Sequence, residues 1–141
     1  MTIRQEALLV TLAAPLIALI AVQGGLLSSS LTVPAWYLLL AAPFWEEWLF
    51  RGALQRRLQD RHWSGRKLAG ISLSNGLTGS VFVLAHLPFQ GTKALLILIP
   101  ALALGRIFEQ TDRIIACILL HGWFNLCWML ATQIIKLGDT V

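Results

Sequence analysis

The stretch Pro43-Phe44-Trp45-Glu46-Glu47-Trp48-Leu49-Phe50-Arg51-Gly52 places two adjacent acids in a run that is otherwise apolar and aromatic. A buried carboxylate is costly unless it is paired, so an acid inside a membrane segment is a candidate for a functional role. On a helix, Glu47 and Arg51 lie four residues apart with the acid first, and this spacing predicts an ion pair on one face. Glu46 lies roughly 100° around the helix from Glu47 and can therefore face a different environment.

The composition predicts an integral membrane protein. The chain has 141 residues, of which only 13% are charged, against about 25% in soluble domains, and its mean hydropathy is +0.71. The net charge of +4 does not indicate nucleic-acid binding, because the basic residues gather in the segment 51–67. This is the pattern of a cytoplasmic loop under the positive-inside rule. We expect one domain over residues 1–141, with the lipid bilayer as its surroundings.

The apolar segments predict an all-α, polytopic membrane helix bundle with about five transmembrane helices. Pro43 is expected to kink the second helix just before the acids, because proline removes a backbone hydrogen bond. With the basic loop inside, the N-terminus lies inside and the C-terminus outside. No strand pattern is present. The five predicted spans are Ala7–Leu27, Val33–Gln59, Leu68–Leu87, Ala94–Ile107 and Ile114–Ile135.

Three of these spans carry polar groups whose burial in a bilayer is energetically costly. A lone histidine in an apolar helix is usually a core residue with a satisfied partner, so the coincidence of several polar groups carries more information than any one. Two acids, two histidines and an asparagine can build a general base, a water site and an oxyanion hole. The polar groups are Glu46, Glu47 and Arg51 in the second span, His86 four residues after Phe82 in the third, and His121 and Asn125, also four apart, in the fifth.

These patterns resemble a known family. Glu-Glu-x-x-x-Arg at 46–51, Phe-x-x-x-His at 82–86 and His-x-x-x-Asn at 121–125 are similar to the three motifs of the CPBP family. Its members are the CAAX-processing and bacteriocin-processing intramembrane endopeptidases, also called the ABI or type II CAAX protease family. The resemblance covers about residues 40–130. Some small members serve C-terminal protein-sorting systems, and the short chain is compatible with such a role.

The resemblance implies a glutamic-type peptidase without a bound metal or other cofactor. Glu46 would be the general base and would activate a water that His86 also holds. The water would attack the scissile carbonyl, and His121 and Asn125 would stabilise the oxyanion. The substrate would be a peptide or protein with a membrane-associated C-terminal segment, cut near its C-terminal or membrane-proximal end.

Three further residues would support the catalytic group. Glu47, paired with Arg51, would orient the helix and set the local field, and Phe82 belongs to the second motif. We therefore expect Arg51→Ala to harm folding chiefly, whereas Glu46→Ala and His86→Ala should each abolish turnover.

The predicted depths of these groups do not agree fully. Glu46 and His121 reach a similar level along their helices, but His86 sits only a few residues from the predicted outer turn. We expect either that the third helix is kinked or tilted, or that the outer connection dips into the membrane.

Other functions stay open. Glutamate and two histidines are legitimate zinc ligands, so a zinc-dependent membrane hydrolase is one alternative, although the chain has no His-Glu-x-x-His sequence. A non-enzymatic protein for bacteriocin immunity or partner binding is another. A proton-coupled transporter is a third, since buried acids and histidines relay protons. Size and resemblance indicate a multi-pass protein of a prokaryotic inner membrane; substrate prenylation and oligomeric state stay open.

Overall fold

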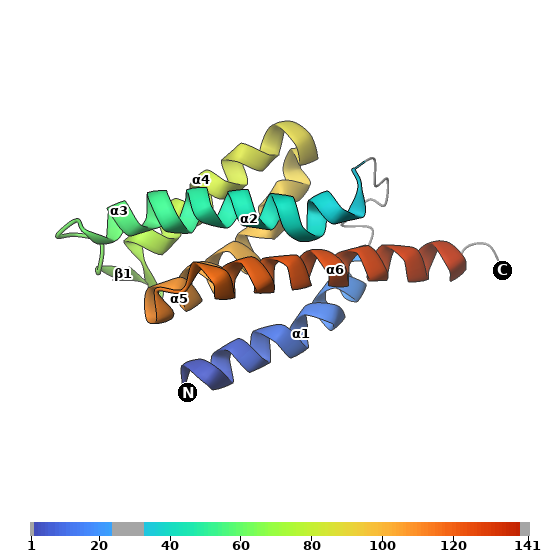
Figure 1. The fold of residues 1–141 in the computed structure, drawn as a ribbon, viewed down its shortest axis with the longest axis horizontal. Coiled ribbons are helices and arrows are strands. Elements are labelled where there is room, and N and C mark those ends of the chain that lie inside the picture. Colours follow the sequence, from blue (N-terminus) through green and yellow to red (C-terminus); the bar gives the residue numbers. More distant parts are fainter. Residues whose placement is uncertain (1, 24–32, 139–141) are drawn as a thin grey trace. The chain divides into compact units, whose positions relative to one another are not determined.

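The structure is a computed structural model that describes residues 2–23 and 33–138. The chain divides into two compact units. Unit 1 comprises Met1–Pro43 and Leu119–Val141, and unit 2 comprises Phe44–Ile118. The described residues are almost entirely helical, which confirms the predicted all-α fold class (Figure 1).

Unit 1 contains α1 (Ile3–Gln23), the π-helical segment η1 (Tyr37–Ala41), the first residues of α2 (Ala42–Glu47) and most of α6 (Ile114–Gly138). The predicted end of the first span at Leu27 lies outside the described residues. Where a kink was predicted at Pro43, the structure has the π-helical turn η1 ending two residues before the proline. Prolines and π-helical turns both interrupt the α-helical hydrogen-bond pattern, and both are established sites of helix kinks.

Unit 2 begins within α2 and continues through a second π-helical segment. It contains η2 (Trp48–Gln55), α3 (Arg56–Gln59), α4 (Leu73–Gln90), the 3-10 segment η3 (Gly91–Ile97) and α5 (Leu98–Thr111). Helices α4 and α5 pack against each other, and η2 packs on both. A small apolar core joins η2, α4 and α5 through Phe50, Phe82 and Ala101.

A β-hairpin precedes α4, where the sequence predicted the helix to begin at Leu68. Strands β1 (Lys67–Leu68) and β2 (Ile71–Ser72) pair antiparallel, with Lys67 opposite Ser72. Ala69 and Gly70 form the turn and both have positive φ, as a two-residue hairpin turn of type I′ requires. Strands of two residues are too short to show an alternating pattern, which explains why the expectation of no strands was wrong.

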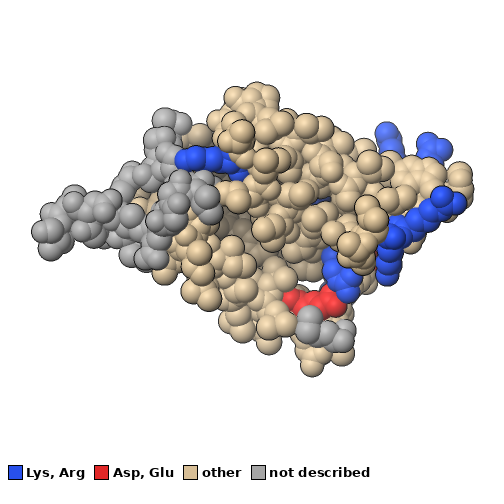
Figure 2. All heavy atoms as spheres, turned by 180° about the vertical axis from the view of Figure 1, so that it is seen from behind, with Lys and Arg blue, Asp and Glu red and all other residues tan. Residues whose placement is uncertain are grey.

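Basic side chains surround this hairpin and the end of α3. Figure 2 shows Lys and Arg gathered at the end of the molecule that carries the hairpin. These exposed residues are Arg56, Arg57, Arg61, Arg66 and Lys67.

Three segments of the described chain are long and apolar enough to cross a membrane: Ile3–Ala21, Leu73–Thr111 and Ile114–Gln133. The predicted count of about five is therefore not confirmed. The third and fourth predicted spans both fall within the stretch Leu73–Thr111, in which Gly91, with a positive φ, caps the end of α4 and α5 packs back against α4. The second predicted span is divided into short α and π segments and carries five charged residues between Glu46 and Arg57.

Candidate active site

Glu46 and His86 lie together in unit 2. Glu46 comes from α2 and His86 from the last turns of α4, and the distance from Glu46 Oε2 to His86 Nε2 is 3.8 Å. Both side chains are partly exposed, at 26% for Glu46 and 21% for His86. Helix α4 continues past Pro88 to Gln90, so His86 is further from the helix end than the sequence indicated.

The other ring nitrogen of His86 determines its tautomer. Nδ1 lies 2.8 Å from the backbone carbonyl oxygen of Phe82, one turn earlier in α4. A carbonyl oxygen only accepts, so Nδ1 carries the proton and donates it there. In the neutral imidazole, Nε2 then has the lone pair, and this lone pair is the one near Glu46.

The ring of Phe82 supports the ring of His86. The two ring centroids are 4.5 Å apart and the planes are tilted by 33°. Phe82 is buried and also contacts Phe50 edge-to-face, at 4.9 Å between centroids. His86 therefore has both its hydrogen bond and its ring face on the same neighbouring residue, which restricts rotation of the imidazole.

Glu47 and Arg51 form the predicted ion pair, and the prediction is confirmed. Arg51 Nε lies 3.1 Å from Glu47 Oε2, and both side chains are completely buried. Arg51 Nη2 donates to the backbone carbonyl of Ala101 at 3.0 Å, and its Cζ lies 5.8 Å from the centroid of the Phe82 ring. The ion pair thus ties the helix of the two acids to α5 and to the aromatic residue beneath His86.

A second polar cluster in unit 2 was not predicted. The carboxylate of Glu109 on α5 accepts hydrogen bonds from Ser72, from Ser74 at 2.8 Å and from Gln55 Nε2 at 3.3 Å. Ser72 also caps α4, because its hydroxyl accepts from the backbone N–H of Asn75. The cluster joins η2, the start of α4 and the end of α5; the N-cap serine was its only sequence signal.

A glycine makes room for this cluster. A Cβ atom added to Gly105 would lie 2.0 Å from Asn75 Oδ1, so no other residue fits there without displacing the asparagine. Gln55 Nε2 donates to the carbonyl of Gly105 at 3.0 Å, and Asn75 Nδ2 donates to that of Leu102 at 2.9 Å. Close backbone contact, rather than a turn, is what requires glycine at this position.

The third predicted motif lies in unit 1. His121 and Asn125 are one turn apart on α6, and His121 is buried. Asn125 Nδ2 donates to the backbone carbonyl of Leu38 in η1, at 2.8 Å. The structure thus brings the first two motifs together in unit 2, while the third belongs to unit 1.

Within the described part of the chain, no group of three or more His, Cys, Asp or Glu side chains could hold a metal ion.

The comparisons with known proteins agree with the motifs. The family model described as type II CAAX prenyl endopeptidase Rce1-like matches residues 28–127, which include all three motifs. No curated protein and no solved structure matches the chain significantly. The matched region covers more than half of the chain and supports the CPBP resemblance. The chain therefore belongs to the Rce1-like family of type II CAAX prenyl endopeptidases, a family of intramembrane proteases.

Proposed function

We propose that the protein is a glutamic-type intramembrane endopeptidase in which Glu46 and His86 activate one water molecule. The observation that carries this proposal is the 3.8 Å separation of Glu46 Oε2 and His86 Nε2. It is too long for a direct hydrogen bond. A water oxygen about 2.8 Å from each atom would see them at an angle of about 85°, close enough to its own bond angle to donate to both.

The chemistry follows from this arrangement. The water donates one hydrogen to the lone pair of His86 Nε2 and the other to the carboxylate of Glu46, and its own lone pair attacks the scissile carbonyl carbon. Glu46 takes the proton as the C–O bond forms. When the C–N bond breaks, Glu46 returns that proton to the leaving nitrogen. The products are a new carboxyl end and a new amino end.

His121 and Asn125 are the proposed donors to the oxyanion. Their one-turn spacing on α6 puts both on one face of the helix. An imidazole N–H and an amide N–H aimed at one point are the kind of donors that stabilise a tetrahedral intermediate.

Glu47 and Arg51 are proposed to hold the site rather than to react. Their mutual ion pair is completely buried. Arg51 also contacts the Phe82 ring, on which the His86 ring lies. These contacts support a positioning role.

The proposed substrate is a membrane-associated peptide or protein, cut near its C-terminal or membrane-proximal end. The family's description as a CAAX prenyl endopeptidase supports this class. We place the protein in a prokaryotic inner membrane and propose that hydrolysis needs no metal. A chelator such as 1,10-phenanthroline should then leave the cleavage rate unchanged, and a loss that zinc alone restores would favour a zinc hydrolase instead.

The test is a comparison of protein termini in host membranes that contain wild-type protein or Glu46→Gln at matched levels. We expect a defined set of membrane-protein ends to disappear in the variant, and those ends would name the substrate and the side of cleavage. Identical profiles would contradict the proposal and favour partner binding or immunity.

A further inference from the structure

Pro43, which precedes the two acids, leaves one backbone carbonyl of η1 without its helical hydrogen bond. The backbone N–H of Ala42 bonds to the carbonyl of Tyr37, five residues earlier, which is the π-helical register. In this register the next donor would be the nitrogen of Pro43, and its acceptor would be the carbonyl of Leu38. Proline has no N–H, so its own helix leaves the Leu38 carbonyl without a backbone donor.

A side chain of α6 donates a hydrogen bond to this carbonyl. Asn125 Nδ2 donates to Leu38 O at 2.8 Å. One turn earlier on α6, Gly122 faces the next carbonyl, where an added Cβ would lie 2.8 Å from Leu39 O. The glycine lets the two backbones approach closely enough for the short asparagine side chain to reach.

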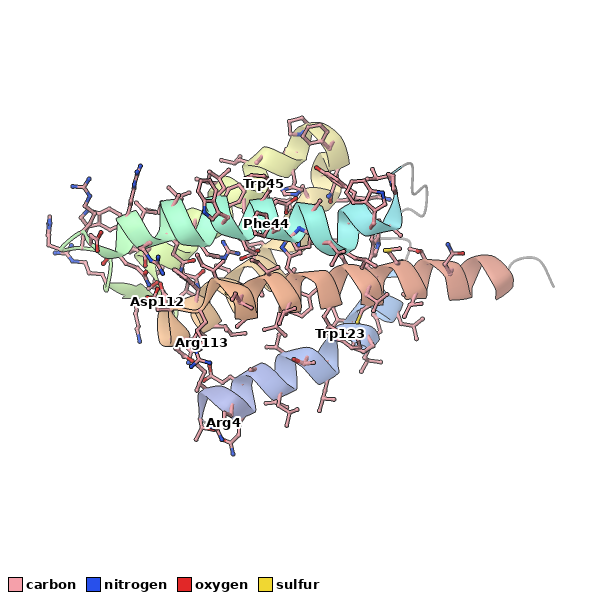
Figure 3. All side chains as sticks on the ribbon, in the orientation of Figure 1. Arg4, Phe44, Trp45, Asp112, Arg113 and Trp123 are labelled. Carbon is pink, nitrogen blue, oxygen red and sulfur yellow. The ribbon has the colours of Figure 1, made fainter. Side chains whose placement is uncertain are left out.

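The same arrangement occurs a second time in unit 1. Pro15 lies inside α1, and in the α-helical register it removes the donor to the carbonyl of Thr11. Trp123 Nε1 on α6 donates to Thr11 O at 2.9 Å (Figure 3). Trp123 and Asn125 project roughly 200° apart around α6. On each of these two sides, α6 therefore donates a hydrogen bond to a carbonyl whose helical donor is replaced by a proline. Within apolar surroundings, donors from neighbouring helices are what make internal prolines tolerable.

We propose that Pro43 is a positioning residue for the amide of Asn125. The carbonyl oxygen of an asparagine amide cannot face another carbonyl, so Leu38 O selects the orientation in which Nδ2 points toward it. One N–H of Asn125 is used in this contact, and the second N–H on the same planar nitrogen is thereby fixed in direction. This inference rests on the proposed role of Asn125 as an oxyanion donor, for which the second N–H would serve.

The test compares Pro43→Ala with Pro15→Ala in the full chain, in lipid nanodiscs, on the substrate that the termini comparison identifies. Pro43→Ala supplies a backbone N–H that competes for the Leu38 carbonyl, so Asn125 loses its fixed orientation. We expect a rate loss of at least about tenfold, toward the 10²–10³-fold loss seen when an oxyanion donor is removed. Thermal stability should not fall, because alanine restores a helical hydrogen bond. Pro15→Ala affects only the hydrogen bond from Trp123 to the carbonyl of Thr11, so its cleavage rate should stay within about twofold of the wild-type rate.

A second readout follows the asparagine itself. The chain contains only two asparagines, Asn75 and Asn125, so selective ¹⁵N labelling gives two side-chain amide signals, which Asn125→Ala assigns. In the wild type, one Asn125 amide proton should be shifted downfield and protected from exchange. Pro43→Ala should remove both properties, whereas Pro15→Ala should leave them in place and neither variant should alter Asn75.

The outcomes separate the two proposals. A wild-type rate in Pro43→Ala, or a loss of rate with an unchanged Asn125 signal, would overturn the role of Pro43. Wild-type cleavage by Glu46→Gln in the same assay would instead overturn the proposed catalytic mechanism, and the amide signals would still report whether Pro43 controls Asn125.

Discussion

The two units satisfy their polar groups in different ways. In unit 2, acidic side chains pair with other side chains, such as Glu46 with His86 and Glu47 with Arg51, and some polar side chains also donate to backbone carbonyls. In unit 1, two side chains of α6 donate to backbone carbonyls of other helices: Asn125 to Leu38 and Trp123 to Thr11.

The difference separates groups that can move protons from groups that fix positions. A carboxylate beside an imidazole can exchange protons with a bound water, and both members are titratable. A backbone carbonyl that has lost its helical donor to a proline accepts hydrogen bonds and does not titrate. It therefore fixes the orientation of the side-chain donor that binds it and takes no part in proton transfer. Apolar surroundings impose the same requirement on both units, because an unsatisfied polar group is costly there.

The largest expected effect concerns the titratable pair of unit 2. His86→Ala removes one of the two acceptors for the proposed water, and cleavage should fall about a thousandfold. Initial rates on the identified substrate measure this. His62→Ala is the matched control, because His62 is exposed in the loop before the hairpin. Equal activity of the two variants would remove His86 from the mechanism.

The buried ion pair gives the next largest effect, on stability. Arg51→Ala removes the cation from a completely buried ion pair, and the free energy of unfolding should fall by about 3–5 kcal/mol. Thermal unfolding in detergent measures this against Arg57→Ala, which alters an exposed arginine. Replacing both members, as Glu47→Leu with Arg51→Met, should recover much of the loss. If the double variant is less stable than Arg51→Ala, the penalty does not come from the loss of the cation beside the buried Glu47 carboxylate.

Close backbone approach in unit 1 is tested by Gly122→Ala. The added methyl group would meet Leu39 O at 2.8 Å, and overpacking of this kind costs about 1–3 kcal/mol. Gly76→Ala in α4 is the control, since its added Cβ would approach only Ile71, at 3.9 Å. Unfolding temperatures that rise equally in both variants would contradict the tight contact between α6 and η1.

The smallest expected effect concerns Trp123. Trp123→Phe removes the donor to the carbonyl released by Pro15, and stability should fall by about 1 kcal/mol. Trp128→Phe is matched to it, because within the described residues Trp128 Nε1 is buried and has no hydrogen-bond partner. A larger loss for Trp128 than for Trp123 would show that burial, not the hydrogen bond, dominates.

The sequence predicted well those contacts that lie within one helix. The spacing of Glu47 and Arg51 was enough to predict their ion pair, and the apolar segments were enough to predict an all-α fold. The pairing of Glu46 with His86 joins two helices, and it was expected only because the motifs resemble those of the CPBP family.

Contacts that depend on backbone register were not predictable. The bond from Asn125 to Leu38 requires a π-helical turn before Pro43, and the sequence indicated only that proline would disturb the helix. The Glu109 cluster needs α4 and α5 packed side by side around Gly105. The hairpin at 67–72 has strands too short for periodicity to reveal them.

The two adjacent acids have opposite proposed roles, so the most direct test compares Glu46→Gln with Glu47→Gln. Both purified variants would be measured for cleavage and for thermal unfolding under the same conditions. We predict that Glu46→Gln unfolds like the wild type but does not cleave, while Glu47→Gln unfolds at a lower temperature and, where folded, still cleaves. Cleavage by Glu46→Gln at the wild-type rate would contradict the assignment of Glu46 as the general base.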